Sequence, residues 1–103
     1  MEPMIERYKA LNRVLRSLHA TVMEIIDAYN YDGKGFVTSS LTNIMGRLLS
    51  DLERLWPEDL DGSKIREIGK LISNNDSDSY WSIVKVLIPA LENSVDDYFS
   101  SQP

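Results

Sequence analysis

The chain has 103 residues, one histidine, no cysteine and a formal net charge of −5 at pH 7. This length gives room for a single domain, residues 1–103, with one core, and the lack of cysteine excludes disulfides and thiolate metal sites. No apolar run approaches the roughly 20 residues that span a bilayer. No basic stretch followed by an apolar segment opens the chain, so we expect a cytoplasmic protein.

The first predicted helix covers about residues 4–29. Its apolar side chains recur at steps of three and four, which places them on one face of a helix. We therefore expect this long helix to supply the centre of the core, and the two glycines in residues 30–35 to end it in a turn. The members of this apolar seam are Tyr8, Leu11, Leu15, Leu18, Val22, Ile25 and Tyr29.

The second predicted helix begins at Ser39 or Ser40, either of which can cap free amides. It ends before Pro57, because the residue preceding a proline avoids the helical conformation. A short third helix is expected after an acidic link, with Ser63 as its cap, and it stops at a polar turn, residues 74–78. The apolar residues of these two helices are Leu41, Ile44, Met45, Leu48, Leu49, Leu52, Leu55 and Trp56, then Ile65, Ile68, Leu71 and Ile72.

The fourth predicted helix covers about residues 79–100, with Asp78 as its cap and Pro89 inside it. Proline leaves the carbonyl of Lys85 without a donor, so we expect a kink. Short links favour antiparallel neighbours. The sequence therefore predicts an all-α, four-helix up-down bundle with a long N-terminal helix, a short third helix and a Pro-kinked C-terminal helix.

The charge is distributed unevenly. Residues 1–50 have a net charge of +1 and residues 51–103 a net charge of −6. An acidic half repels phosphate backbones, so we expect no nucleic-acid partner. The acidity of residues 51–103 has two explanations: it keeps the protein soluble, or it steers the protein electrostatically toward a basic protein partner. The candidate partner-binding residues are Tyr31 and Phe36 beside the glycine turn, and the acidic Asp76, Asp78, Glu92, Asp96 and Asp97, helped by Glu58, Asp59 and Asp61 in the link.

Motifs that carry chemistry are weak. Residues 28–39 resemble a calcium-binding loop around Gly33, but Ala28 and Ser39 stand where that loop needs its first and last carboxylates. The sequence has no phosphate-binding glycine loop and no nucleophile motif. We therefore predict a protein without catalytic activity, cofactor or metal.

One pair of residues carries an enzymatic alternative. The spacing of Arg13 and His19 resembles the arginine–histidine motif of the HEPN ribonucleases, which are helical bundles, although Val14 follows the arginine where that family usually has a polar residue. The resemblance implies metal-independent RNA cleavage. Six residues along one helix put the two side chains about 120° apart, so they would have to meet across a dimer.

Three functional hypotheses follow. The first is a protein-binding module: an inhibitor, an immunity or antitoxin-like protein, or a small subunit of a larger assembly. The second is the HEPN-like ribonuclease. The third is a homo-oligomeric scaffold, because Ile5, Val14 and Ile26 widen the apolar surface of the first helix enough for a homodimer.

Overall fold

The computed structural model describes residues 3–32 and 39–101, and the side chains of residues 4–28 and 40–101. Three helices come first: α1 (Pro3–Asp32), α2 (Ser39–Leu55) and α3 (Ser63–Asn74). A last helical segment consists of α4 (Ser77–Ser82), the π-helical turn η1 (Ile83–Leu87) and α5 (Ile88–Ser100). The described residues contain no strand, so the all-α class is confirmed.

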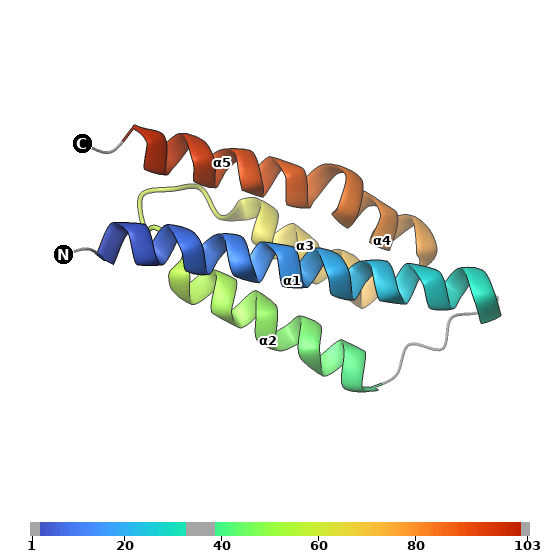
Figure 1. The fold of residues 1–103 in the computed structure, drawn as a ribbon. Coiled ribbons are helices and arrows are strands. Elements are labelled where there is room, and N and C mark those ends of the chain that lie inside the picture. The colour runs from blue at the N-terminus through green and yellow to red at the C-terminus, as the bar shows by residue number, and fades with distance from the viewer. Residues whose placement is uncertain (1–2, 33–38, 102–103) are drawn as a thin grey trace.

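Helix α1 is the element on which the others are assembled. It lies between α2 and the α4–η1–α5 segment, with α3 behind it, and consecutive helices run in opposite directions (Figure 1). Contacts join α1 to α2, α4, η1 and α5, whereas α3 packs on α2, α4 and η1. The molecule is elongated, about 49 × 21 × 17 Å. The start of α1, the end of α2 and the end of α5 meet at one end of it (Figure 1).

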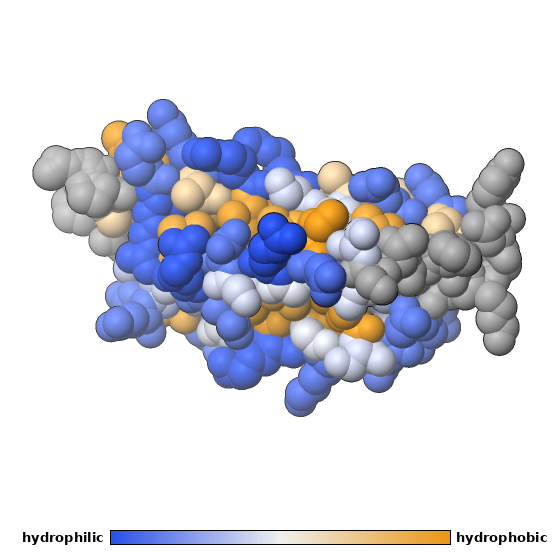
Figure 2. Space-filling model, turned by 90° about the horizontal axis from the view of Figure 1, so that it is seen from below, coloured by the Kyte–Doolittle hydropathy of each residue, from blue (hydrophilic) through white to orange (hydrophobic). Residues whose placement is uncertain are grey.

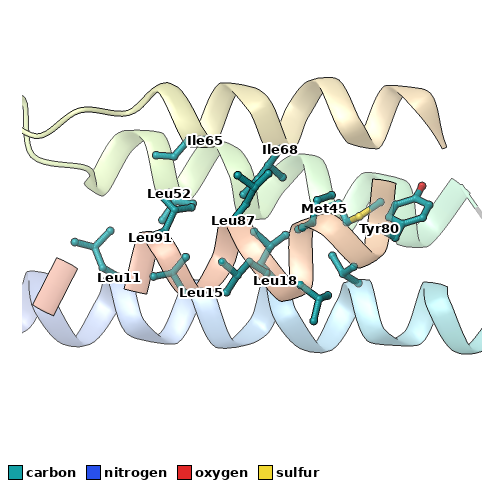
Figure 3. Packing of buried hydrophobic residues seen from close by; sticks show 14 of the residues in the cluster. Leu11, Leu15, Leu18, Met45, Leu52, Ile65, Ile68, Tyr80, Leu87 and Leu91 are labelled. Atoms are coloured by element: carbon teal, nitrogen blue, oxygen red, sulfur yellow. The ribbon is translucent and has the colours of Figure 1, made fainter. Parts of the chain in front are cut away.

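The apolar seam of α1 forms the centre of the core, as the sequence predicts. Leu11, Leu15 and Leu18 are completely buried and lie against residues of α2, η1 and α5 (Figure 3). Burying each such side chain contributes about 1.5–3 kcal/mol. The remaining buried apolar residues are Val22, Ile25, Ile26, Met45, Leu52, Trp56, Ile65, Ile68, Tyr80, Ile83, Val84, Leu87, Ile88, Leu91 and Val95.

Helix α1 is longer than predicted, since residues 30–32 are helical and do not form part of a turn. Asn30, Tyr31 and Asp32 are weak helix formers, each costing only a fraction of a kcal/mol, and the first strong helix breaker is Gly33. The predicted core position of Tyr29 lies outside the described side chains.

The cap of α3 also differs from the prediction. Its N-cap is Gly62, and Ser63 is the first helical residue. The carboxylate of Asp61 accepts hydrogen bonds from the Ser63 backbone N–H (3.2 Å) and from the Ser63 hydroxyl (2.8 Å). An aspartate one residue before the cap therefore binds the amide of Ser63 itself, one of the free amides of the first helical turn.

The cap of α4 is Asp76, two residues earlier than the predicted Asp78. Its Oδ1 accepts a hydrogen bond from the Ser79 backbone N–H at 2.7 Å. The helix can begin this early because Asn75 takes a left-handed conformation (φ 52°, ψ 51°), which ends α3 sharply. Asp78 lies in the first turn of α4, where a negative charge suits the helix dipole.

Pro89 is accommodated by a π-helical turn. The helical segment continues through this residue, and the Ile88 N–H bonds to the carbonyl of Ile83, five residues back. A proline ring clashes with the carbonyl four residues earlier, here that of Lys85. Lys85 lies within η1, so the wider π turn falls where an α-helical turn would produce that clash.

Candidate functional site: the acidic end

The link between α2 and α3 is folded tightly around Trp56. The indole of Trp56 is 7% exposed, and its Nε1–H donates to the carbonyls of Leu60 (3.1 Å) and Asp61 (3.2 Å). The Leu60 N–H bonds to the carbonyl of Pro57 at 3.2 Å, which closes a β-turn. These bonds fix the backbone that carries Glu58, Asp59 and Asp61.

Arg7 ties α1 to the end of α2. Its Nε donates to the carbonyl of Leu55 at 2.6 Å, and its Nη2 donates to the carbonyl of Trp56 at 3.0 Å. The last carbonyls of a helix have no partner within the helix and carry its negative dipole end, so a guanidinium there is stabilising. The positive charge of Arg7 is therefore directed into the molecule, toward backbone carbonyls.

Two tyrosine–aspartate hydrogen bonds join the link and α1 to the end of α5. The Tyr98 hydroxyl donates to Asp59 Oδ1 at 2.9 Å, and the Tyr8 hydroxyl donates to Asp96 Oδ1 at 2.8 Å. Phe99 lies between the two phenols, with ring centroids 5.1 Å from Tyr98 and 5.5 Å from Tyr8. Residues 39 and 88 positions apart in the chain are thereby held side by side.

These contacts perturb three ionisable groups. The hydrogen bonds to Asp96 and Asp59 raise the pKa of Tyr8 and of Tyr98, respectively, above the ordinary 10.0. The hydrogen bonds from Ser63 lower the pKa of Asp61 below its usual 3.8. Both phenols therefore remain donors, and Asp61 remains an anion, throughout the physiological pH range.

The result is a cluster of five exposed carboxylates that we call the acidic end: Glu58, Asp59, Asp61, Asp96 and Asp97. Three come from the link and two from the last turns of α5. Within the described residues, the carboxylates of Glu58 and Asp97 have no hydrogen-bond or ion-pair partner, which leaves them free to bind another molecule.

The predicted partner-binding residues are divided between two ends of the molecule. Asp76 and Asp78 lie at the start of the last helical segment and Asp96 and Asp97 near its end, about 30 Å away at 1.5 Å per residue. Glu92 lies one turn before Asp96. The side chain of Tyr31 and all of Phe36 lie outside the described part of the chain.

Sequence reasoning missed the contribution of Arg7, Tyr8 and Tyr98 to this site. The apolar spacing predicts Tyr8 as a core residue, but Tyr8 and Tyr98 are both only half-buried, and each donates its hydroxyl to a carboxylate. The available signal was their position near helix ends, where an aromatic ring can pack inward while its hydroxyl reaches solvent.

Two shallow grooves border the acidic end. One, of about 620 Å³, lies between α1 and α5, with Lys9, Arg13 and Arg16 on one wall and Glu92 and Asp96 on the other. The second, of about 520 Å³, lies beside Trp56 and has Glu53, Glu58, Asp61 and Arg66 around apolar atoms of the link.

The ribonuclease pair is not assembled within one chain. Helix α1 is unbroken from Pro3 to Asp32, and both Arg13 and His19 are exposed on it. Their side chains are thus about 120° apart around the helix. Arg13 instead shares the α1–α5 groove with Arg16.

The described residues hold few other candidate sites. Nowhere in the described ranges do three histidine, aspartate or glutamate side chains gather closely enough to hold a metal ion. Among the same residues, no helix combines the length and apolar character needed to cross a membrane. Comparison of the chain with models of protein families, with curated proteins and with solved structures gives no significant match.

Proposed function

We propose that the protein is a small helical binding module that docks to a basic protein partner through its acidic end. The observation that carries the proposal is the pair of tyrosine–aspartate bonds, 2.9 Å and 2.8 Å long. The first joins the acidic link, residues 58–61, to the last turns of α5, which carry Asp96 and Asp97, and the second joins these turns of α5 to α1. An acidic patch of this kind attracts an oppositely charged partner and raises its association rate.

Two further features support docking at this end. The Arg7 side chain donates to the carbonyls of Leu55 and Trp56 and so forms no ion pair with a carboxylate of the patch. The link that presents Asp59 and Asp61 is held by the Trp56 indole. A surface that is ordered before binding loses less conformational entropy when the partner arrives. Such a module fits the role of an inhibitor, of an immunity or antitoxin-like protein, or of a small subunit of a larger assembly.

The test is affinity capture from the native organism at low and at moderate salt, followed by a binding titration with the partner that is recovered. The decisive variant is Glu58→Gln with Asp97→Asn, because neither carboxylate has a partner in the described structure. We expect a basic protein that elutes as salt screens charges beyond about 8–10 Å. The variant should bind it at least about tenfold more weakly.

The matched control is Glu24→Gln with Asp27→Asn, which removes the same charge from exposed positions on the far half of α1. This control should bind like the unchanged protein. Equal weakening in both variants would show that only net charge matters. Recovery of an acidic partner, or binding indifferent to salt and to Glu58 and Asp97, would contradict the proposal.

A further inference from the structure

A third groove, of about 260 Å³, runs between α1 and α2 and differs in chemistry from the acidic end. Its floor is apolar, formed by Ala10 and Val14 of α1 and by Leu48 and Leu55 of α2. Ile44, one turn before Leu48 on α2, is 40% exposed and extends this apolar surface. Seen from the α2 side, apolar side chains form a band between polar ones (Figure 2).

The rim of the groove is basic. Arg13 and Arg54 line it, and Arg47 lies one turn before Asp51 on α2. Arg54 contacts Asp51 at 3.1 Å, but its side chain is 69% exposed, so this pair is screened by water and leaves guanidinium donors free. A chain of net charge −5 therefore has three arginines against one lining aspartate, Asp51, on and beside this apolar groove.

We propose that the α1–α2 groove binds an amphipathic helix of a protein partner that carries acidic side chains beside its apolar face. Grooves between two helices accept apolar anchors at steps of three, four and seven residues from a third helix. The basic rim selects acidic flanks on that helix. The inference goes beyond the proposed function, since it assigns a second surface of opposite charge to a different kind of partner.

Two other occupants fit the groove less well. A second copy of the chain would bring the same arginines, Arg13, Arg47 and Arg54, against their own counterparts, and like charges at an interface are repulsive. The phosphates of RNA would pair with the arginines, but RNA would leave the apolar floor of Val14 and Leu48 without a matching apolar surface.

The test uses two synthetic helical peptides of about 18 residues, or five turns. Both have leucines at steps of three and four; one has glutamates beside them and the other has lysines at the same positions. Titration of the folded protein, followed by fluorescence anisotropy, should show the glutamate peptide binding at least about tenfold more tightly than the lysine peptide.

Three variants locate the binding. Ile44→Glu should weaken binding of the glutamate peptide by about tenfold or more, and Arg13→Glu should abolish or reverse the preference between the peptides. Val86→Glu is the matched control, because Val86 is 60% exposed on η1, outside this groove, and this change should have no effect. Circular dichroism of each variant confirms that it is folded.

Several outcomes would overturn the inference: equal binding of the two peptides, no saturable binding of the glutamate peptide, or equal weakening by Ile44→Glu and Val86→Glu. So would light scattering that shows a dimer broken by Ile44→Glu, or a single-stranded RNA that binds and is lost with Arg13→Glu. None of these results depends on Glu58 or Asp97, so the inference and the proposed function can fail separately.

Discussion

At the scale of the residue, the middle of the α1 seam contributes most to stability. Leu15 and Leu18 are completely buried, and Leu→Ala in such a site loses both the transfer free energy and the contacts around the cavity that remains. We expect Leu15→Ala or Leu18→Ala to lower the free energy of unfolding by about 2–5 kcal/mol, measured by urea denaturation.

The control for this prediction is Val86→Ala, at a residue that is 60% exposed. A surface truncation should change stability by no more than about 0.5 kcal/mol. If Leu15→Ala were as mild as the control, the seam of α1 would not be the centre of the core.

Asp61 gives a prediction about pH. Hydrogen bonds from Ser63 lower its pKa in the folded state below the ordinary 3.8, so its contribution to stability is present above that value and is lost as the pH falls through the folded pKa. Ser63→Ala removes the hydroxyl donor. We expect the pKa of Asp61, followed by NMR titration of the carboxyl carbon, to rise toward its ordinary value in this variant.

Ser73→Ala is the matched control, since the Ser73 hydroxyl bonds to the carbonyl of Gly69 near the other end of α3. It should leave the titration of Asp61 unchanged. An Asp61 pKa that does not respond to Ser63→Ala would mean that this hydroxyl bond does not form in solution.

At the scale of the element, the start of α4 distinguishes two aspartates that the sequence makes equally attractive. Asp76 accepts the Ser79 N–H, whereas Asp78 contributes only its charge to the first turn. Asp76→Ala should therefore cost about 1 kcal/mol in the free energy of unfolding, and Asp78→Ala about 0.3–1 kcal/mol at low ionic strength. High salt should reduce the cost of Asp78→Ala, because salt screens the charge. Thermal unfolding of both variants is the measurement, and a larger loss of stability in Asp78→Ala would contradict the assignment of Asp76 as the cap.

Helix positions were predictable because their signals are local or periodic. Spacing of apolar residues identified the seam from Leu11 to Ile25, and Pro57 marked the end of α2, whereas the end of α1 was predicted three residues too early. The capping residues were harder to predict than the helices. At the starts of α4 and α3, Asp76 and Asp78, or Asp61 and Ser63, offer similar oxygen acceptors two residues apart, and the backbone conformation decides which of them binds a free amide. The position of Pro89 marked an irregularity in the last helix, but proline chemistry alone does not decide between a bend and the π turn that the structure shows.

The site was only partly predictable for a related reason. The acidity of Asp96 and Asp97 is visible in the sequence, and so is that of the link. Their proximity depends on the hydrogen bond between Tyr98 and Asp59, which are 39 positions apart. Pairings at such separations follow from the tertiary arrangement of helices, so a single sequence gave the charges without showing that the two segments meet.

At the scale of the whole molecule, the apolar surface that suggested self-association is largely used within the chain. Ile26 is completely buried and Val14 is partly buried against the core, while Ile5 is 63% exposed. We expect light scattering to give the mass of one chain, 11.8 kDa, across a concentration series. If the mass doubled at a protein concentration below about 1 mM, the free energy of dimerisation would be about 4 kcal/mol or more. That result would favour the homo-oligomeric scaffold.

The bond between Tyr8 and Asp96 also has a consequence for synthesis on the ribosome. Its partners are 88 residues apart, so on the order of 5–20 s passes between the making of one and the making of the other at cellular rates of translation. In the later part of that interval α1 is complete but α5 is not, and the part of the α1 seam that α5 covers is open to water. A nascent chain of this design therefore passes through a stage at which it can bind a chaperone or aggregate, and it leaves that stage only when its last helix docks.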